Sequence, residues 1–246
     1  MKRLRWKIIF GVSLICLSVF FYFIQIEIFK SPRDTFFYLF QDIAFVPISV
    51  LMVTVIISEV LDLREKQSLL RKLNMVIGAF FSEVGTALLK SFPDFAPDYD
   101  IREIDLLVTA EWSNNEFARA KRQVRNHDYQ IDSRRGDLEG LKQFLIGKRD
   151  FLLRLLENPN LLEHRSFTNL LRAVFHLTEE LEYRKDIHGL PSTDYEHLSS
   201  DIKRVYSMLL FEWLAYMGYL QKYYPYLFSL AVRTNPFDPN ASPEVK

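Results

Sequence analysis

Two long apolar runs open the chain, and a short polar connection separates them. The first covers residues 8–29 with a single acid, Glu27, near its end, and the second begins at Phe36. About 20 apolar residues in a helix are enough to cross a bilayer, so both runs predict membrane-spanning helices. The connection KSPRDT is too short to form an external domain. The pattern therefore predicts a transmembrane hairpin over residues 1–61, with the lipid bilayer as partner.

A cleaved signal peptide is the competing interpretation of the first run, because basic residues precede it. The run is longer than an ordinary signal-peptide core, no small-residue cleavage site follows it, and the second run begins at once. We therefore expect an uncleaved span. Basic residues precede the first run and follow the second, whereas the connection holds only Lys30 and Arg33. This distribution predicts a two-pass protein with both termini in the cytoplasm.

The second span continues without a helix breaker into an amphipathic segment, because neither Gly nor Pro occurs between Pro47 and Gly78. One helix over 36–91 would be about 80 Å long, more than a bilayer requires. Residues 62–92 are thus predicted to form a stalk. Its apolar residues recur at spacings of three and four: Leu70, Leu73, Ile77, Phe80, Val84 and Ala87. The stripe is wider than a coiled-coil seam, so the stalk should pack on helices of its own chain or of neighbours.

Helical periodicity dominates the rest of the chain, which we assign to a cytoplasmic domain over 93–233. Pro93 and Pro97 end the stalk. Helices are expected over 101–112, 114–126, 134–157, 161–185 and 195–233, with Pro225 bending or breaking the last. No stretch alternates like a strand, so the fold class is all-α, a helical bundle. The proline-rich segment 234–246 is predicted to be an extended tail, with Phe237 as a docking anchor as the alternative.

Composition limits the chemistry. The net charge of zero over 246 residues argues against nucleic acid as a partner. The single cysteine, Cys16, lies in the first span, so neither a disulfide nor a cysteine-based zinc site is expected within one chain. The sequence contains no G-x-S-x-G, H-E-x-x-H, P-loop or G-x-G-x-x-G motif. We therefore expect no enzyme activity and no cofactor.

Three residues of the second span are candidate intramembrane functional positions: Asp42, Pro47 and Ser49. A carboxylate in the membrane is costly unless it faces a partner or water. Tyr22 of the first span comes level with Asp42 in an antiparallel hairpin, and a hydrogen bond between them is the structural interpretation. The functional alternative is a ring of Asp42 side chains at the mouth of a cation pore, with Pro47 as a hinge.

Two further groups of residues are candidates for binding. Arg119, Lys121, Arg122 and Arg125 form a basic cluster that would suit anionic lipid headgroups or a phosphorylated ligand, or that serves as a solvated helix face. Four histidines lie in the window 164–197 among many acids. Di-iron bundles use paired Glu-x-x-His motifs, and none occurs here. His176 with Glu179 has the reverse order once, so a metal site is considered and not expected.

The segments LNMVIGAFFSEVGTALL (73–89) and YYPYLFSLAVRTNPFDP (223–239), together with the hairpin, resemble a family of uncharacterised bacterial and archaeal membrane proteins. The resemblance covers nearly the whole chain and implies no activity. It implies that the spans and the helical domain form one unit, and that the protein resides in a prokaryotic inner or plasma membrane.

These patterns lead to three functional hypotheses. The first is a non-enzymatic membrane protein that self-associates as a homo-oligomer and presents its helical domain to an unidentified cytoplasmic protein in signalling or scaffolding. The second is a gated cation channel formed by the same oligomer. The third is a membrane-bound metal-dependent enzyme that uses the late histidine window.

Overall fold

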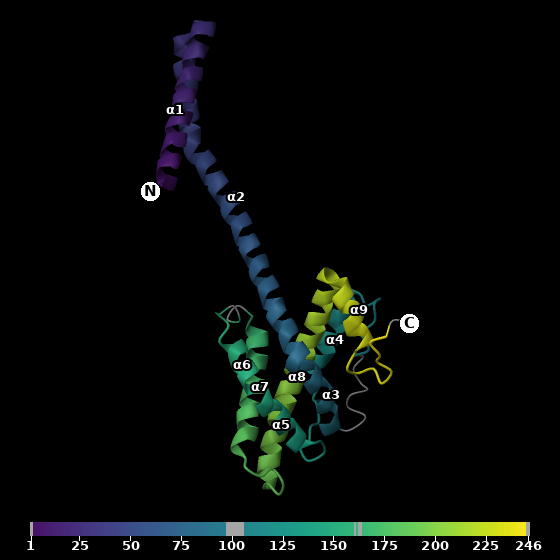
Figure 1. Ribbon diagram of the computed structural model, residues 1–246. Helices are drawn as coiled ribbons and strands as arrows, with labels where there is room; N and C mark the ends of the chain where they lie inside the picture. The colour runs from purple at the N-terminus through teal and green to yellow at the C-terminus, as the bar shows by residue number, and fades with distance from the viewer. Residues whose placement is uncertain (1, 97–105, 160, 162–163, 245–246) are drawn as a thin grey trace. The chain divides into compact units, whose positions relative to one another are not determined.

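The computed structural model describes residues 2–96, 106–159, 161 and 164–244; most of these residues are helical and none of them lies in a strand (Figure 1). The expected all-α class is confirmed. The helices in chain order are α1 (Lys2–Phe29), α2 (Pro32–Phe80), the π-helical turn η1 (Phe81–Gly85), α3 (Thr86–Ser91), the 3-10 turn η2 (Phe92–Phe95), α4 (Asn114–Asn126), α5 (Leu138–Gly147), α6 (Arg149–Leu156), α7 (Arg165–Tyr183), α8 (Ser192–Tyr223) and α9 (Pro225–Arg233).

The chain divides into two compact units, Met1–Lys66 and Gln67–Lys246, which we call the hairpin unit and the helical unit. In the hairpin unit, α1 and the first part of α2 lie side by side. The connection between them is only two residues long because α1 ends at Phe29 and α2 begins at Pro32. Lys30 has a positive φ of 50°, the left-handed conformation that often ends helices, and Pro32 suits the first turn of the next helix.

Apolar side chains of the hairpin unit are exposed on α1 and α2. The windows Val12–Phe29 and Pro32–Glu65 have mean hydropathies of 2.1 and 2.3, and neither is buried at all. A third window, Arg71–Phe95, is also long and apolar enough to span a membrane, but 44% of it is buried. The basic side chains at Lys2, Arg3, Arg5 and Lys7, on which the predicted orientation rests, lie outside the described side chains.

The segment predicted as a separate stalk joins the helical unit from Gln67 onward. Leu73, Ile77, Phe80 and Val84 of its apolar stripe are buried in the core of that unit. The stripe is wide because it meets helices of its own chain on several sides, whereas Leu70 lies outside the described side chains. The predicted division at residue 92 therefore differs from the compact units, which divide the chain at Lys66.

Ala87 is the exception in the stripe, because it is exposed while Leu88 and Leu89 are fully buried. The π-helical turn Phe81–Gly85 explains the difference. A π turn holds an extra residue, so it rotates the following residues around the helix axis relative to an uninterrupted α-helix. Gly78 also has a packing role: a Cβ there would lie 2.7 Å from the hydroxyl oxygen of Tyr216. The glycine thus admits a side chain of α8 rather than another backbone.

Helix α8 runs through the helical unit and packs against α4, α7 and α9. Its buried residues include Tyr206, Leu209, Leu210 and Trp213. Tyr206 meets the ring of Phe92 edge-on, with ring centroids 5.8 Å apart. The core is thus continuous between α8 and the helical segment that follows α2.

The predicted helix over 101–112 is wrong for residues 106–112, which are not helical, while Pro97 and 101–105 lie outside the described residues. Side chains from elsewhere satisfy the backbone of this segment. Asn235 Nδ2 donates to the Leu106 carbonyl at 2.9 Å, and Gln221 Nε2 donates to the Trp112 carbonyl at 2.8 Å. These long-range bonds replace the local bonds of a helix, and a local pattern does not reveal them.

Other boundaries follow local chemistry. The helix expected over 114–126 is confirmed as α4, whose capping box pairs Ser113 with Glu116. Pro225 separates α8 from α9 as expected. The segment expected over 134–157 is divided, because α5 ends at Gly147 and α6 begins at Arg149. The predicted extended tail packs on the helical unit over part of its length, since Asn235 is buried and the Phe237 ring centroid lies 5.2 Å from that of Trp213, the contact that the docking-anchor alternative expects.

Candidate functional site

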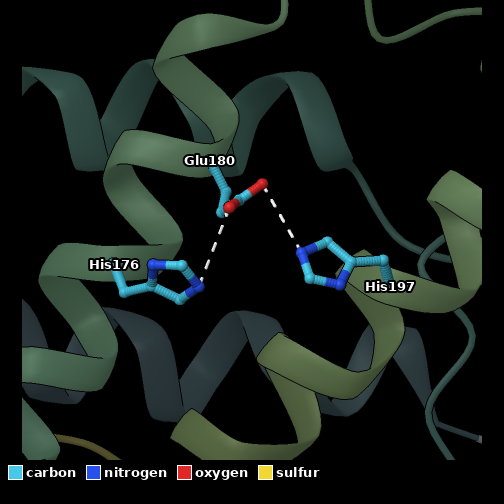
Figure 2. A group of neighbouring side chains, drawn as sticks. All are labelled: His176, Glu180 and His197. Atoms are coloured by element: carbon cyan, nitrogen blue, oxygen red, sulfur yellow. Dashed lines mark ion pairs between the residues drawn. The ribbon is translucent and has the colours of Figure 1, made fainter.

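Helices α7 and α8 pack against each other, and each carries a histidine followed four residues later by an acid. The pairs are His176 with Glu180 on α7, and His197 with Asp201 on α8. Residues four apart lie on the same face of a helix, so each histidine stands beside its own acid. The packing of the two helices brings the pairs together. We call His176, Glu180, His197 and Asp201 the metal cluster; Figure 2 shows three of them converging.

The nitrogen and oxygen atoms of this cluster are regularly spaced. Nε2 of His176 lies 3.5 Å from Oδ2 of Asp201 and 3.8 Å from Oε1 of Glu180. Nε2 of His197 lies 3.4 Å from Oδ2 of Asp201 and 3.5 Å from Oε2 of Glu180. One ligand atom from each of His176, Glu180 and His197 can be chosen so that all lie within 4.8 Å of one another.

These separations are longer than ordinary hydrogen bonds of about 2.7–3.2 Å. They match the distances between ligands of one metal ion. A tetrahedral Zn²⁺ with bonds of about 2.0–2.1 Å holds its ligand atoms about 3.3–3.4 Å apart. Each imidazole nitrogen therefore lies near both carboxylates, at separations that a shared metal ion would also impose.

Asp201 is the most unusual member, because its side chain is only 2% exposed. Its Oδ1 accepts a hydrogen bond from Nη1 of Arg204 at 2.8 Å. Its Oδ2 is buried, has no hydrogen-bond partner and lies between the two imidazole nitrogens. A buried polar atom in this state is rare and requires an explanation. A cation held by the cluster would supply the missing partner.

Arg184 organises the other carboxylate of the cluster. Its Nη1 lies 2.7 Å from Oε2 of Glu180, and its Nη2 lies 2.6 Å from Oδ1 of Asp194. Hydrogen bonds from this guanidinium lower the pKa values of both Glu180 and Asp194. Glu180 is thereby kept ionised and oriented, as a metal-binding carboxylate must be. The imidazoles of His176 and His197 are 45% and 50% exposed, so ions can reach the cluster from solvent.

The candidate residues of the second span are placed differently. The Tyr22 hydroxyl donates to Oδ2 of Asp42 at 3.2 Å, the bond that the structural interpretation expects. Ser49 donates to the Phe45 carbonyl of its own helix at 3.1 Å, and Pro47 lies inside α2. Tyr22 and Asp42 line a cavity of about 620 Å³ in the hairpin unit. The pore role of these three residues needs several copies of the chain and stays a prediction.

The basic cluster lies on α4, where its four residues spread over about half of the helix circumference. Lys121 and Arg125 are four residues apart and occupy one side of the helix, near Glu212 of α8. Arg119 and Arg122 are exposed and lie around the helix from them, and Nε of Arg122 donates to the Ala118 carbonyl at 3.4 Å. The contact with anionic lipid or phosphate stays a prediction.

Sequence reasoning did not bring these four residues together because it searched for a glutamate three residues before a histidine. The signal present is different: a histidine precedes an acid by four residues, once on each of two consecutive helices. The earlier comparison of His176 with Glu179 chose the wrong acid, since Glu180 is the one that reaches the cluster.

Nearly the whole chain matches one family of known proteins. Residues 2–61 match the family described as MJ1433, N-terminal helical domain, and residues 69–233 match the family described as uncharacterized protein MJ1433, C-terminal helical domain. The chain belongs to the MJ1433 family. It is 45% identical over 238 residues to uncharacterized protein MJ1433 of Methanocaldococcus jannaschii, covering 97% of this chain and 96% of that protein. No solved structure matches it. Family membership therefore shows the pairing of two helical regions and assigns no reaction.

Proposed function

We propose that this chain is a membrane-anchored protein whose helical unit binds a divalent transition-metal ion at the metal cluster. The observation that carries the proposal is the spacing of the cluster. Two imidazole nitrogens lie 3.4–3.8 Å from two carboxylates, close to the edges of a metal-ligand tetrahedron. The buried, unpartnered Oδ2 of Asp201 supports it, because a bound cation would compensate that atom.

The donor set favours zinc. Two imidazoles and two carboxylates suit borderline ions, whereas Ca²⁺ and Mg²⁺ prefer oxygen ligands alone. Arg184 and Arg204 fix the carboxylates from outside the cluster, as hydrogen-bonding partners do in many metal sites. Fe²⁺, Mn²⁺ and Ni²⁺ accept similar ligands and Cu²⁺ binds such donors more tightly, so zinc is proposed for its tetrahedral geometry and not as the sole ion that the cluster binds.

The same ligand set supports a non-catalytic role. With Asp201 as a fourth ligand beside His176, Glu180 and His197, the site would be closed, whereas catalytic zinc keeps a position for water or substrate. The half-exposed imidazoles suit an ion that exchanges with solvent. The metal would link α7 to α8 when bound, so the proposed role is metal-responsive binding at a membrane surface rather than hydrolysis.

The anchor part of the proposal rests on the hairpin unit. Its two apolar windows have no buried share, and rings such as Phe40 are 74% exposed. An apolar surface of this extent on a protein in water would be an aggregation hazard, whereas lipid would cover it. The window Val12–Phe29 has the 18 residues of a short span. The inner or plasma membrane, with both termini in the cytoplasm, is the proposed location.

The metal part is tested by titrating metal-free, full-length protein in detergent with Zn²⁺ against a chromophoric chelator. One ion per chain is expected, with binding weakened about 100-fold or more in His176→Ala and His197→Ala. His188→Ala is the matched control, because His188 is exposed and lies outside the cluster. Equal affinities of wild type and both cluster variants would overturn the proposal.

The anchor part can use the single cysteine as its probe. Cys16 is exposed on α1, so it would react with a maleimide if the hairpin stood in water. In liposomes we expect no reaction with a membrane-impermeant maleimide until detergent is added. A Cys16→Ser, Ser200→Cys variant is the positive control, since Ser200 is exposed on α8. Full labelling of Cys16 in sealed liposomes would contradict the anchor.

The remaining hypotheses stay predictions. Self-association through the spans is measured by native mass spectrometry in nanodiscs, and a cation channel by flux into liposomes with Asp42→Asn as the variant. The pairing of Asp42 with Tyr22 inside one chain gives the channel no support of its own. The proposal above does not depend on either result.

A further inference from the structure

A second polar site lies in the helical unit, between α4, α7 and α8. It is a cavity of about 240 Å³, which we call the Glu212 cavity. Arg125 of α4, Ser166 and Asn169 of α7, and Phe211 and Glu212 of α8 line it. None of these residues belongs to the metal cluster. The volume is below the roughly 300–1,000 Å³ of sites for drug-sized ligands, so it suits a ligand of few atoms.

Glu212 is a buried carboxyl without a full set of partners. The residue is 2% exposed, and its Oε1 has no hydrogen bond although it is buried. Burial raises the pKa of Glu212, and the Ser166 hydroxyl, His164 and Lys121 act in the opposite direction. Leaving such a group unpaired is unfavourable, and more so when it is charged. The unpartnered carboxyl oxygen thus stands at the wall of a cavity, where a donor group of a ligand could bond it.

Arg125 lies on the same cavity and is held in position by an aromatic ring. Its guanidinium carbon is 4.9 Å from the centroid of the Phe211 ring. Within the part of the chain that the structure describes, Arg125 forms no ion pair, and Glu212 is beyond ion-pair distance. One cavity therefore has an exposed cation that rests on an aromatic ring and a buried carboxyl, and the two do not form an ion pair.

We propose that the Glu212 cavity binds a small zwitterion of the amino-acid class. The ligand carboxylate would pair with Arg125, which offers a planar fork of donors, and the ligand ammonium would donate to Glu212. The ligand's side group would lie on Phe211 and Met208, which form the apolar wall. An anion alone would leave Glu212 unpaired, and an amine alone would leave Arg125 unpaired. The zwitterion offers a partner to both.

Ser166 and Asn169 add hydrogen-bonding capacity on the α7 side. Ser166 also lies 3.4 Å from Nδ1 of His164, the residue that caps α7. A ligand in the cavity would therefore affect the residues that cap the start of α7. The metal cluster lies further along the same helix. The binding proposal does not rest on the metal proposal, because no ligand of one site is a ligand of the other.

The test is isothermal titration calorimetry of full-length protein in detergent with the standard amino acids. We expect at least one to bind, and its deaminated acid and its decarboxylated amine to bind at least about 10-fold more weakly. No binding of any amino acid at about 10 mM would overturn the proposal. Equal binding of the deaminated acid or of the amine would overturn it too, and would identify a site for an anion or a cation alone.

Three variants separate binding from folding. Glu212→Gln and Arg125→Gln should each weaken the bound amino acid about 10-fold or more, because each removes one charge pair. Arg122→Gln on the same helix should have no effect, since Arg122 does not line the cavity. Thermal unfolding shows that each variant is folded, and Zn²⁺ titration shows that the metal cluster is unaffected. Unchanged affinity in a folded Glu212→Gln protein would refute the assignment of the carboxyl.

Discussion

Helix α8 buries two carboxyl groups in two different ways. Asp201 and Glu212 are each 2% exposed. Asp201 accepts from Arg204 at one oxygen and has two imidazoles within 3.5 Å of the other. Glu212 has a buried oxygen without a hydrogen bond and faces a cavity. The difference teaches that two buried acids on one helix can have different roles. Asp201 lies beside two imidazoles that could share a metal ion with it, whereas Glu212 lacks a hydrogen-bond donor that a ligand could supply.

The two acids occupy equivalent places on the helix surface. They are eleven residues apart, about three turns or 16 Å at 1.5 Å per residue, so they lie on nearly the same face. Both also have counterparts on α7: His176 stands near Asp201, and Ser166 acts on Glu212. The two proposed sites therefore lie along one α7–α8 interface and are separated by apolar core. Changes to that core should disturb both sites, and changes at one acid should leave the other intact.

The largest effect is expected from the core between the sites. Leu209 is fully buried on α8, so Leu209→Ala should lower the free energy of unfolding by about 2–5 kcal/mol. Chemical denaturation of the full-length protein in detergent measures it. Leu230→Ala is the control, because Leu230 is 44% exposed and should change stability by less than about 0.5 kcal/mol. Equal effects of both substitutions would contradict the proposed packing of α8.

The next largest expected effect is a loss of Zn²⁺ affinity at the metal cluster alone. Asp201→Asn keeps the shape of the side chain but removes its charge, so Zn²⁺ affinity should fall about 100-fold. Chelator competition measures the affinity, and amino-acid binding at the Glu212 cavity should not change. Because histidine ligands bind metal only when neutral, affinity should also fall on acidification. If Asp201→Asn bound zinc as wild type does, the buried carboxyl would be an ion-pair partner of the histidines and not a ligand.

A smaller effect is expected outside the ligands. Arg204 donates to the oxygen of Asp201 that does not face the imidazoles, so Arg204→Gln should weaken Zn²⁺ binding about 10-fold by loosening the carboxylate. Arg172→Gln on α7 is a control, since Arg172 is exposed and no ion pair joins it to the metal cluster among the described residues. A loss as large as that of Asp201→Asn would mean that Arg204 holds α8 together rather than orienting one side chain.

Most of the fold was predictable because its information is local. Apolar runs gave the hairpin helices, Ser113 and Glu116 define the start of α4, and Pro225 separates α8 from α9. The segment 106–112 was mispredicted as a helix because its carbonyls are bonded to Gln221 and Asn235, more than 100 residues away. The periodicity of apolar residues within a segment does not reveal hydrogen bonds to side chains that are distant in the sequence.

The candidate sites were less predictable than the helices. Asp42 was correctly matched to Tyr22, because an antiparallel hairpin has only one geometry to consider. The metal cluster depends on the register between α7 and α8, which is set by core packing and not by either helix alone. The two histidine-acid pairs could have been found as a repeated spacing. Their convergence could not, and neither could the cavity beside Glu212.

The smallest expected effect is a pH dependence of stability caused by Glu212, the second of the two buried acids. Because the folded pKa of Glu212 is raised by burial, the folded state holds a proton that the unfolded state releases as the pH rises. This contribution to stability is complete below the unfolded pKa of about 4.5 and is lost as the pH rises towards the folded pKa. Glu212→Gln removes that loss, so the free energy of unfolding of the variant should rise relative to that of wild type as the pH increases. Denaturation curves at pH 5 and pH 8 measure the gain without ligand. A variant that is equally destabilised at both values would show that the carboxylate is already satisfied in the folded chain, which would remove the reason for a ligand to complete it.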